Sequence, residues 1–153
     1  MLNDLFTRFD HIAEHRGLEK IKTIGDCYVA AAGLPVVATD HADRAAKMSL
    51  DMPVAIQDFN ASSQHPLNIR IGISTGAAVA GVIGKSKFVY DLWSDVVNTA
   101  SRMESHGTAG RIQISDATRQ ALLQPFSLEH CGVIKFNGKC EMSTWFLNKS
   151  DQN

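Results

Sequence analysis

The stretch KFVYDLWSDVVNTASRMESHG, Lys87–Gly107, decides the fold class because its hydrophobic period changes partway along. Its first part, up to Trp93, is aromatic and β-branched, which favours a strand. From Ser94 to Ser105 apolar residues recur at helical spacing and share one stripe: Val96, Val97, Ala100 and Met103. A strand that turns directly into an amphipathic helix predicts mixed α and β structure.

The opposite side of this helix carries Asn98 and Arg102, seven and eleven residues after Asp91. A solvated polar face would explain both side chains without any ligand. However, Asn is a poor helix former in a helix interior, so its place there needs a reason. Arg presents a planar fork of donors that matches phosphate oxygens, and Asn can bond a ribose hydroxyl. The residues alone leave a solvated face and a nucleotide site both open.

Outward from this stretch, strand and helix signals alternate without internal repeats or low-complexity tracts. We expect a helix over the first sixteen residues ended by Gly17, a hairpin over 18–35 about Gly25 and Asp26, a helix from Ala42 to Phe59 with a kink or break at Pro53, and two or three strands within 67–93. A strand Arg111–Ile114, a helix Ser115–Leu123 and strands Phe126–Phe136 and Met142–Leu147 follow. This order favours one domain, 1–153, built as an α+β sandwich with helices packed on one sheet.

Composition excludes several function classes. With 153 residues, 44% hydrophobic, 20% charged and a net charge of -1, the chain has no basic excess for binding nucleic acid. No apolar run approaches the roughly 18 residues of a membrane span, so we expect no membrane contact by this segment. Three widely spaced cysteines without metal-ligand spacing favour reduced thiols and a cytoplasmic location, even if the full-length protein is anchored elsewhere. Gly76 and Gly81 have the P-loop gap, but Val82 stands where Lys is required.

The predicted hairpin carries two further candidates, Lys22 on its first strand and Asp26 at its tip. A lone carboxylate at a turn usually bonds the local backbone, and a strand lysine is usually exposed. Alternatively, Mg²⁺ prefers one or two carboxylates together with substrate phosphate oxygens. A lysine beside a purine can also donate to a ring nitrogen, so these residues too are compatible with a nucleotide site.

Five segments, in order, resemble the catalytic domain of class III nucleotide cyclases, the adenylate and guanylate cyclase family. They are EKIKTIGDCYVAAAGLP, DHADRAAKMSLDM, NIRIGISTGAAVAGVIG, FVYDLWSDVVNTASRMESHGTAGRIQIS and NGKCEMSTWFL. The resemblance runs from about Leu2 to Leu147. It implies the family's ferredoxin-like βαβ sandwich and a head-to-tail homodimer with active sites at the subunit interface. Such a dimer converts a nucleoside triphosphate to a 3′,5′-cyclic monophosphate and pyrophosphate.

The resemblance also implies a role for each candidate residue. Asp26 matches one of two aspartates that hold two metal ions, Mg²⁺ or Mn²⁺. Lys22 and Asp91 match the pair that reads the purine, Asn98 the residue that orients the ribose, and Arg102 the one that stabilises the transition state. The metal aspartates come from one subunit and the other four residues from its partner. Guanylate cyclases are similar except for Glu and Cys at the purine positions, so the Lys and Asp here imply ATP.

The chain departs from the family pattern in three places. The family's first strand, F-x-D-I-x-x-F, holds the other metal aspartate, and nothing upstream of Leu2 supplies it, so we expect an N-terminally truncated domain. Asn137 falls where many relatives have a phosphate-binding lysine, and Lys139 or Lys135 would have to substitute for it. Ser94 replaces a usual glycine and is expected to cap the helix that follows.

Two functions follow from these observations. The first is an adenylate cyclase catalytic domain, with the isolated chain weak or inactive because half of its metal site is absent. The alternative is a non-catalytic nucleotide-binding pseudo-cyclase or partner subunit. The presence of the purine, ribose and transition-state residues favours the enzyme, whereas the absent strand favours the partner.

Overall fold

The structure is a computed structural model, and it describes residues 2–24, 27–33, 39–61, 66–76, 79–83, 89–93, 95–105, 110–134 and 142–148. Its elements are α1 (Leu2–Arg16), β1 (Glu19–Ile24), β2 (Cys27–Ala31), α2 (His41–Ala61), β3 (Ile71–Ile73), β4 (Val79–Ile83), β5 (Val89–Trp93), α3 (Asp95–Ser105), β6 (Ile112–Ser115), α4 (Asp116–Ala121), β7 (Ser127–Ile134) and β8 (Met142–Asn148). The predicted order of helices and strands is confirmed. The predicted cap Ser94 lies outside the described residues.

Helix α1 forms and ends as its sequence predicts. Leu5, Phe9 and Ala13, spaced by four, are all buried. Gly17 ends the helix with a φ of 79°, a left-handed conformation that glycine adopts without strain. The Leu18 N–H then donates to the Ala13 carbonyl at 2.8 Å and satisfies one of the open carbonyls of the last turn.

The strands that the structure describes pair as three sheets rather than the one sheet that the sequence suggested. Strands β3, β6, β8 and β7 form a four-stranded sheet, in which β3 is parallel to β6 and the other pairs are antiparallel. Strands β1 and β2 form one hairpin sheet, and β4 and β5 form another. The expectation of one sheet is wrong. Among the described strands, β2 pairs only with β1 and β3 pairs only with β6, so no strand joins the hairpin sheet to the four-stranded sheet.

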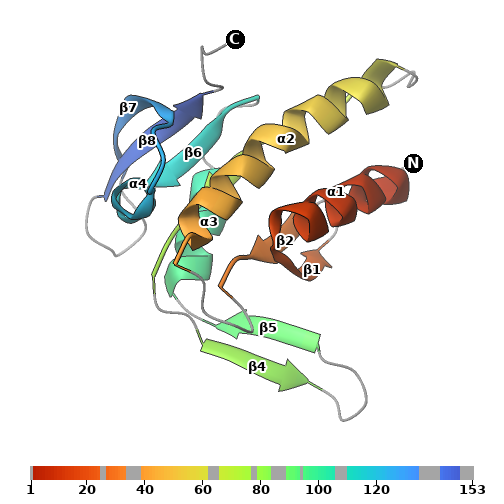
Figure 1. Cartoon of the computed structure of the whole chain (residues 1–153), viewed down its shortest axis with the longest axis horizontal. Helices are drawn as coiled ribbons and strands as arrows, with labels where there is room; N and C mark the ends of the chain where they lie inside the picture. The colour runs from red at the N-terminus through yellow and green to blue at the C-terminus, as the bar shows by residue number, and fades with distance from the viewer. Residues whose placement is uncertain are drawn as a thin grey trace.

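Among the described side chains, two apolar clusters form most of the core, and α2 contributes to both. The first joins α1 to α2 through Leu5, Phe9, Ala13, Met48, Met52, Ala55, Ile56 and Phe59, and partly buried residues of β2 and β3 pack against it. The second joins Ala46 of α2 to Ile112, Ile114 and Leu147 of the four-stranded sheet. Figure 1 shows α2 running between α1 with its hairpin and the sheet that carries α4.

Helix α2 is continuous from His41 to Ala61 although it contains Pro53. The expected break at this residue does not occur. A proline inside a helix removes one backbone hydrogen bond and costs about 3 kcal/mol. Met52 before it and Ala55 after it are both buried in the first cluster, and this packing on either side offsets the cost.

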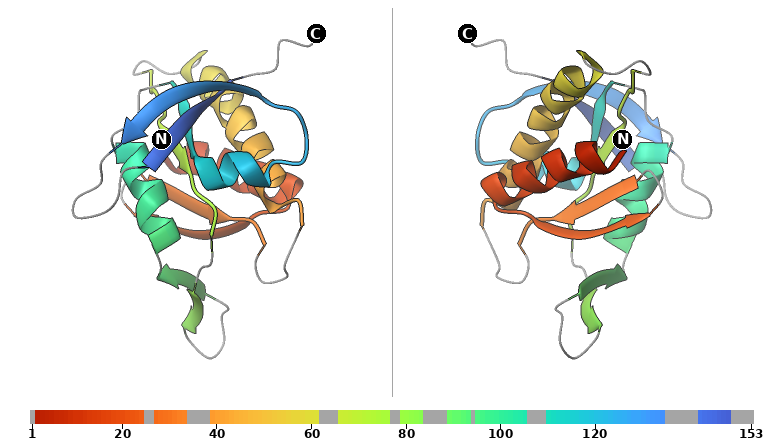
Figure 2. Two further views of the ribbon diagram at one scale, coloured as in Figure 1. Left: turned by 90° about the vertical axis from the view of Figure 1, so that its left-hand side faces the viewer. Right: turned by 90° about the vertical axis from the view of Figure 1, so that its right-hand side faces the viewer.

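The hairpin β4–β5 projects away from the rest of the domain in both views of Figure 2. Its contacts with the body run mainly through β1, which lies against β5. No helix in the described part of the chain is long and apolar enough to cross a membrane.

The start of α2 is tied to the segment after α4 by Asp43, which is 3% exposed. Its two carboxylate oxygens accept the Leu123 N–H at 2.8 Å and the Gln124 N–H at 3.2 Å. Asp43→Ala removes both bonds and leaves the amides to partial solvation, so the free energy of unfolding should fall by about 1–3 kcal/mol. Urea denaturation measures this loss. Asp58→Ala, an exposed position on the same helix, should change it by less than about 0.5 kcal/mol, and equal losses in the two variants would contradict the assignment.

Candidate active site

The hairpin β1–β2 places Lys22 as predicted, on the first strand, opposite Val29 of β2. The register shifts between Lys20 and Lys22, so the strand is bulged immediately before the candidate residue. Ile24 pairs with Cys27, which confirms the predicted hairpin. Asp26 itself lies outside the described residues, so its role as a metal ligand stays a prediction.

Asp91 occupies the middle of β5, where its backbone pairs with Gly81 of β4. Because β5 lies against β1, the two strands that carry Lys22 and Asp91 are neighbours within one chain. The sequence places these residues far apart, and the fold brings their strands together. This proximity is what a single base read by both residues requires.

In the described side chains of α3, the sequence prediction is confirmed for Met103 and Arg102, whereas the side chains of Val96, Val97 and Asn98 lie outside the description. Met103 is fully buried, at 0% exposure, and the helix lies against β3 and β6. Arg102, one position earlier, is exposed. No hydrogen bond or ion pair joins its guanidinium to another side chain in the part of the chain that is described, whereas Glu104 pairs with Arg70 at 3.6 Å. Within the described residues, therefore, no side chain occupies the donors of Arg102. The Asn98 backbone is helical, as expected.

A buried hydroxyl cluster holds the chain where it leaves β3 toward the β4–β5 hairpin. Thr118, at 0% exposure, has its hydroxyl 2.8 Å from that of Thr75 and 3.0 Å from that of Ser115. The Ser115 hydroxyl also accepts the Thr118 N–H at 3.2 Å and caps α4. This anchor was missed from sequence. The cap was within reach of a sequence argument, but the partner across the fold was not.

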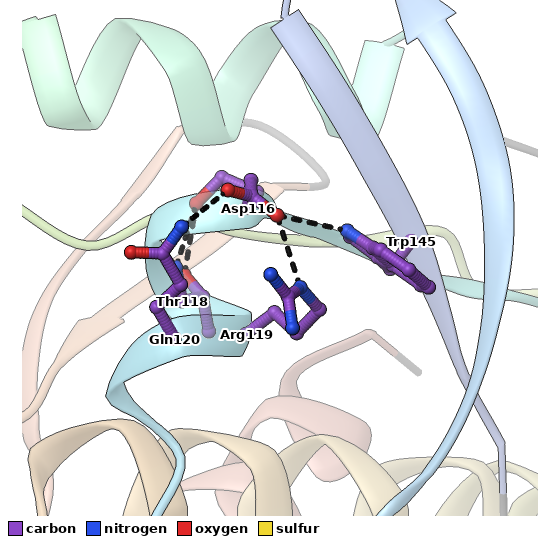
Figure 3. A network of polar contacts seen from close by, with 6 residues as sticks. Asp116, Thr118, Arg119, Gln120 and Trp145 are labelled. Carbon is purple, nitrogen blue, oxygen red and sulfur yellow. Dashed lines mark hydrogen bonds and ion pairs between the residues drawn. The ribbon is translucent and has the colours of Figure 1, made fainter.

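A second network fixes α4 on β8 and is shown in Figure 3. The Asp116 carboxylate accepts hydrogen bonds from Arg119 Nε at 2.9 Å, Gln120 Nε2 at 2.6 Å and Trp145 Nε1 at 3.2 Å. The bonds from Arg119 and then from Trp145 hold the pKa of Asp116 below its usual value. Arg119 also lies over the Trp145 ring, 4.9 Å from its centroid. These charges satisfy one another, so the network serves packing rather than chemistry.

Polar residues also line a cavity of about 330 Å³ at the end of α1 and the start of α2. Its lining residues are Glu14, His15, Arg16, Gly17, Asp40, Asp43, Arg44, Lys47 and Gln124. None of the predicted site residues is among them. Arg44 is paired with Asp40 at 2.9 Å and Arg16 with Asp51 at 2.6 Å, so the cavity's arginines are engaged within the protein.

The metal and phosphate predictions fall largely outside the described residues. Within the described ranges, no group of three or more His, Cys, Asp or Glu side chains could hold a metal ion. Asp26, Lys135 and Lys139 all lie outside those ranges. Their assignments stay predictions.

The chain is similar to proteins of one enzyme family. A family model described as "Adenylate and Guanylate cyclase catalytic domain" matches residues 1–149. "Adenylate cyclase" of Mycobacterium tuberculosis is 40% identical over 146 residues, which cover 95% of this chain and 33% of the relative. "Guanylate cyclase soluble subunit beta-2" of Rattus norvegicus is 39% identical over 149 residues, which cover 96% of this chain and 22% of the relative.

A solved structure gives the same result for the fold. The guanylate cyclase domain of RhGC from Catenaria anguillulae, in complex with GTP, superposes with a TM-score of 0.87 at 40% identity, over 97% of this chain and 81% of that one. The chain spans about a third of the length of the mycobacterial relative and carries the α+β fold of the catalytic domain. It belongs to the adenylate and guanylate cyclase family, as a nucleotide cyclase catalytic domain.

Proposed function

We propose that this domain is an adenylate cyclase, which converts ATP to 3′,5′-cyclic AMP and pyrophosphate. The observation that carries the choice of ATP is that Lys and Asp occupy positions 22 and 91, on strands β1 and β5, which lie next to each other. A lysine ammonium donates to adenine N1, and an aspartate accepts from the exocyclic amine. Guanine presents the reverse pattern on the same edge, which this pair would leave unsatisfied.

The relatives support either purine, since those most similar include both a named adenylate cyclase and a named guanylate cyclase. Overall identity is therefore a poor guide to the substrate. Only the side chains that bond the base edge distinguish the two purines, and a polar site rejects the wrong partner by leaving buried donors and acceptors unpaired. The proposal for ATP rests on Lys22 and Asp91 for this reason.

Asn98 and Arg102 act on the sugar and the phosphates in this proposal. The 3′-oxygen attacks the α-phosphorus, its proton leaves, and the bond from that phosphorus to the pyrophosphate oxygen breaks. Asn98 orients the ribose so that the 3′-oxygen faces the phosphorus. The exposed guanidinium of Arg102 meets the negative charge that develops on the transferring phosphoryl group. Lys139 or Lys135 binds the leaving phosphates.

Asp26 holds the divalent ion in this proposal. A carboxylate combined with phosphate oxygens is the donor set that Mg²⁺ favours, and Mn²⁺ accepts the same oxygens. When bound, the ions neutralise the triphosphate and lower the pKa of the 3′-hydroxyl. In the sequence, Asp26 follows Ile24, the last residue of the strand that carries Lys22, by two positions.

The domain works as a head-to-tail homodimer, and residues 1–153 form one domain in which the family's first strand fits at the open edges of β2 and β3. Both strands place side chains on the first core cluster, Tyr28 and Ala30 from β2 and Ile71 from β3. In the described residues each of the two strands has a paired neighbour on one side only. The same open edges also favour the alternative function, a nucleotide-binding partner subunit without activity of its own.

The purine assignment is tested in the full-length protein by exchanging the pair. Lys22→Glu together with Asp91→Cys should lower the ratio of kcat/KM for ATP to that for GTP by about tenfold or more, because each mismatched bond to the base costs about 1–3 kcal/mol. Cyclic AMP and cyclic GMP are measured with Mg²⁺ and with Mn²⁺. Lys20→Glu, a charge reversal at a 41% exposed position of the same strand, should leave the ratio unchanged. An unmodified protein that prefers GTP would show that the purine assignment is wrong.

A further inference from the structure

Gly72 of β3 lies directly under α3. A Cβ atom at this position would be 2.4 Å from the Ala100 carbonyl oxygen, 2.8 Å from the Glu104 backbone nitrogen and 3.1 Å from Met103 Cβ. Two of these three atoms belong to the backbone, which no rotamer change can move. The contact therefore fixes how closely the helix can approach the strand.

Glycine is not needed here for its backbone conformation. Among the described residues, the glycines with positive φ are Gly17, Gly33 and Gly110, and Gly72 is not one of them. Its neighbours Ile71 and Ile73 pack on the second core cluster. Because side chains alternate along a strand, position 72 points to the opposite face, where α3 lies. Because glycine has no side chain, the backbone of α3 can occupy the space where a Cβ atom at position 72 would lie.

We infer that Gly72 is a positioning residue for the cyclase reaction, because it sets how closely α3, the helix that carries Asn98 and Arg102, approaches β3. This inference rests on the proposed function. Met103, which is 0% exposed, lies at the contact with Gly72, and Arg102 is the residue before it in the same helix. A change at this contact that moves α3 therefore moves Arg102 as well. The distance between α3 and β3 at this contact is set by the backbone atoms of Ala100 and Glu104 and by Met103 Cβ, none of which belongs to a charged or hydrogen-bonding side chain.

The size of the displacement follows from ordinary contact distances. Contacts of a Cβ atom normally begin at 3.4 Å, so an alanine at position 72 would push the Ala100 carbonyl away by about 1 Å. A misplacement of about 1 Å at a reacting group costs on the order of a hundredfold in rate. Lys22 and Asp91 lie on β1 and β5, outside this contact, so base binding should be affected far less than turnover.

In the full-length protein, Gly72→Ala should lower kcat for cyclic AMP formation about 10-fold to 100-fold, while KM for ATP stays within about threefold. Ile73→Val, on the same strand but facing the other core, should leave kcat within about twofold. A Gly72→Ala enzyme with normal kcat would overturn the inference.

Mixing subunits separates positioning from general damage. In the proposed dimer each site takes α3 from one subunit and the metal aspartates from the other. Gly72→Ala subunits should therefore regain activity when mixed with Asp26→Ala subunits, which supply an undisturbed α3. They should gain nothing from Arg102→Ala subunits. Rescue by Arg102→Ala, or no rescue by either, would show that Gly72 does not act through α3.

Two further measurements test the role of Gly72 even if Gly72→Ala folds poorly or if the protein makes no cyclic nucleotide. Met103→Phe enlarges the helix side of the same contact and should also lower kcat with little change in KM; a normal kcat would count against the inference. A crystal structure of either variant should show α3 displaced from β3 by about 1 Å, and an unmoved helix overturns the inference whatever the activity. An unmodified protein without cyclase activity would refute the proposed function alone.

Discussion

Subunits carrying Asp26→Ala and subunits carrying Arg102→Ala, each nearly inactive alone, should regain cyclase activity when they are mixed. Loss of either group should reduce kcat by roughly a thousandfold, the scale of about 4 kcal/mol of transition-state stabilisation. In the proposed dimer the two residues serve opposite sides of each composite site. A heterodimer thus combines both defects in one site and leaves the other site intact.

The size of the recovery is fixed by counting sites. If the two variants exchange freely at equal concentrations, half of the dimers are mixed, and each has one good site of two, so activity should reach about a quarter of the unmodified level. Cyclic AMP formation is followed after the subunits have exchanged. Asn98→Ala mixed with Arg102→Ala is the control, because both changes affect the same side and should give no recovery. A mixture of Asp26→Ala and Arg102→Ala that stays at the level of its separate components would refute the composite site.

A protein consisting of residues Met1–Asn153 alone should be nearly inactive. Its kcat should be about a thousandfold lower than that of a protein that includes the family's first strand. One carboxylate would have to serve two divalent ions, so at least one ion should bind weakly. The triphosphate then keeps uncompensated charge, and the 3′-hydroxyl keeps a high pKa. The base and ribose positions are not changed, so nucleotide should still bind weakly, which a fluorescent ATP analogue can report.

The same chain should nevertheless support turnover in a mixed dimer. In a dimer with an Arg102→Ala subunit that carries the first strand, one site combines Arg102 of the shorter chain with both metal aspartates of the longer subunit. Introducing Arg102→Ala into the shorter chain as well should abolish the recovery and provides the matched control. Rapid cyclic AMP synthesis by Met1–Asn153 alone would show that its metal site is completed by other residues and that the first strand is not required.

Sequence reasoning succeeded where the signal is local. The stripe that ends in Met103 predicted a buried face, and Met103 is fully buried while Arg102 beside it is exposed. The glycine end of α1 and the hairpin that turns between Ile24 and Cys27 were also predicted correctly. In each case the deciding residues lie within a few positions of one another, so the period of the pattern carries the information.

Features that depend on distant contacts could not be read in this way. The Asp43 carboxylate binds a backbone amide 80 residues later, and no local pattern distinguishes it from the acids nearby. Pro53 predicted a kink or a break; the break is wrong because α2 is continuous, with buried neighbours on either side of the proline, and the kink stays a prediction. The close approach at Gly72 is also a tertiary property, since glycine in a strand is explained equally well by a bulge or a turn.

The candidate site was named mainly by family resemblance rather than by physical pattern. Periodicity alone favoured a solvated face over a ligand site for Asn98 and Arg102. The fold adds that the strands of Lys22 and Asp91 are adjacent and that Arg102 is exposed. Sequence could not supply this adjacency, because it depends on how the β4–β5 hairpin packs against β1.

The position of α2 between the two core clusters has a consequence for dividing the domain into fragments. Met48 and Met52 of this helix face one cluster, whereas Ala46 faces the other, so a cut on either side of α2 deprives one cluster of a wall. Fragments separated there would each expose apolar surface and would regain order only on meeting. Cuts beside α2 are therefore the natural places to design a split reporter that assembles when two fused proteins bind each other.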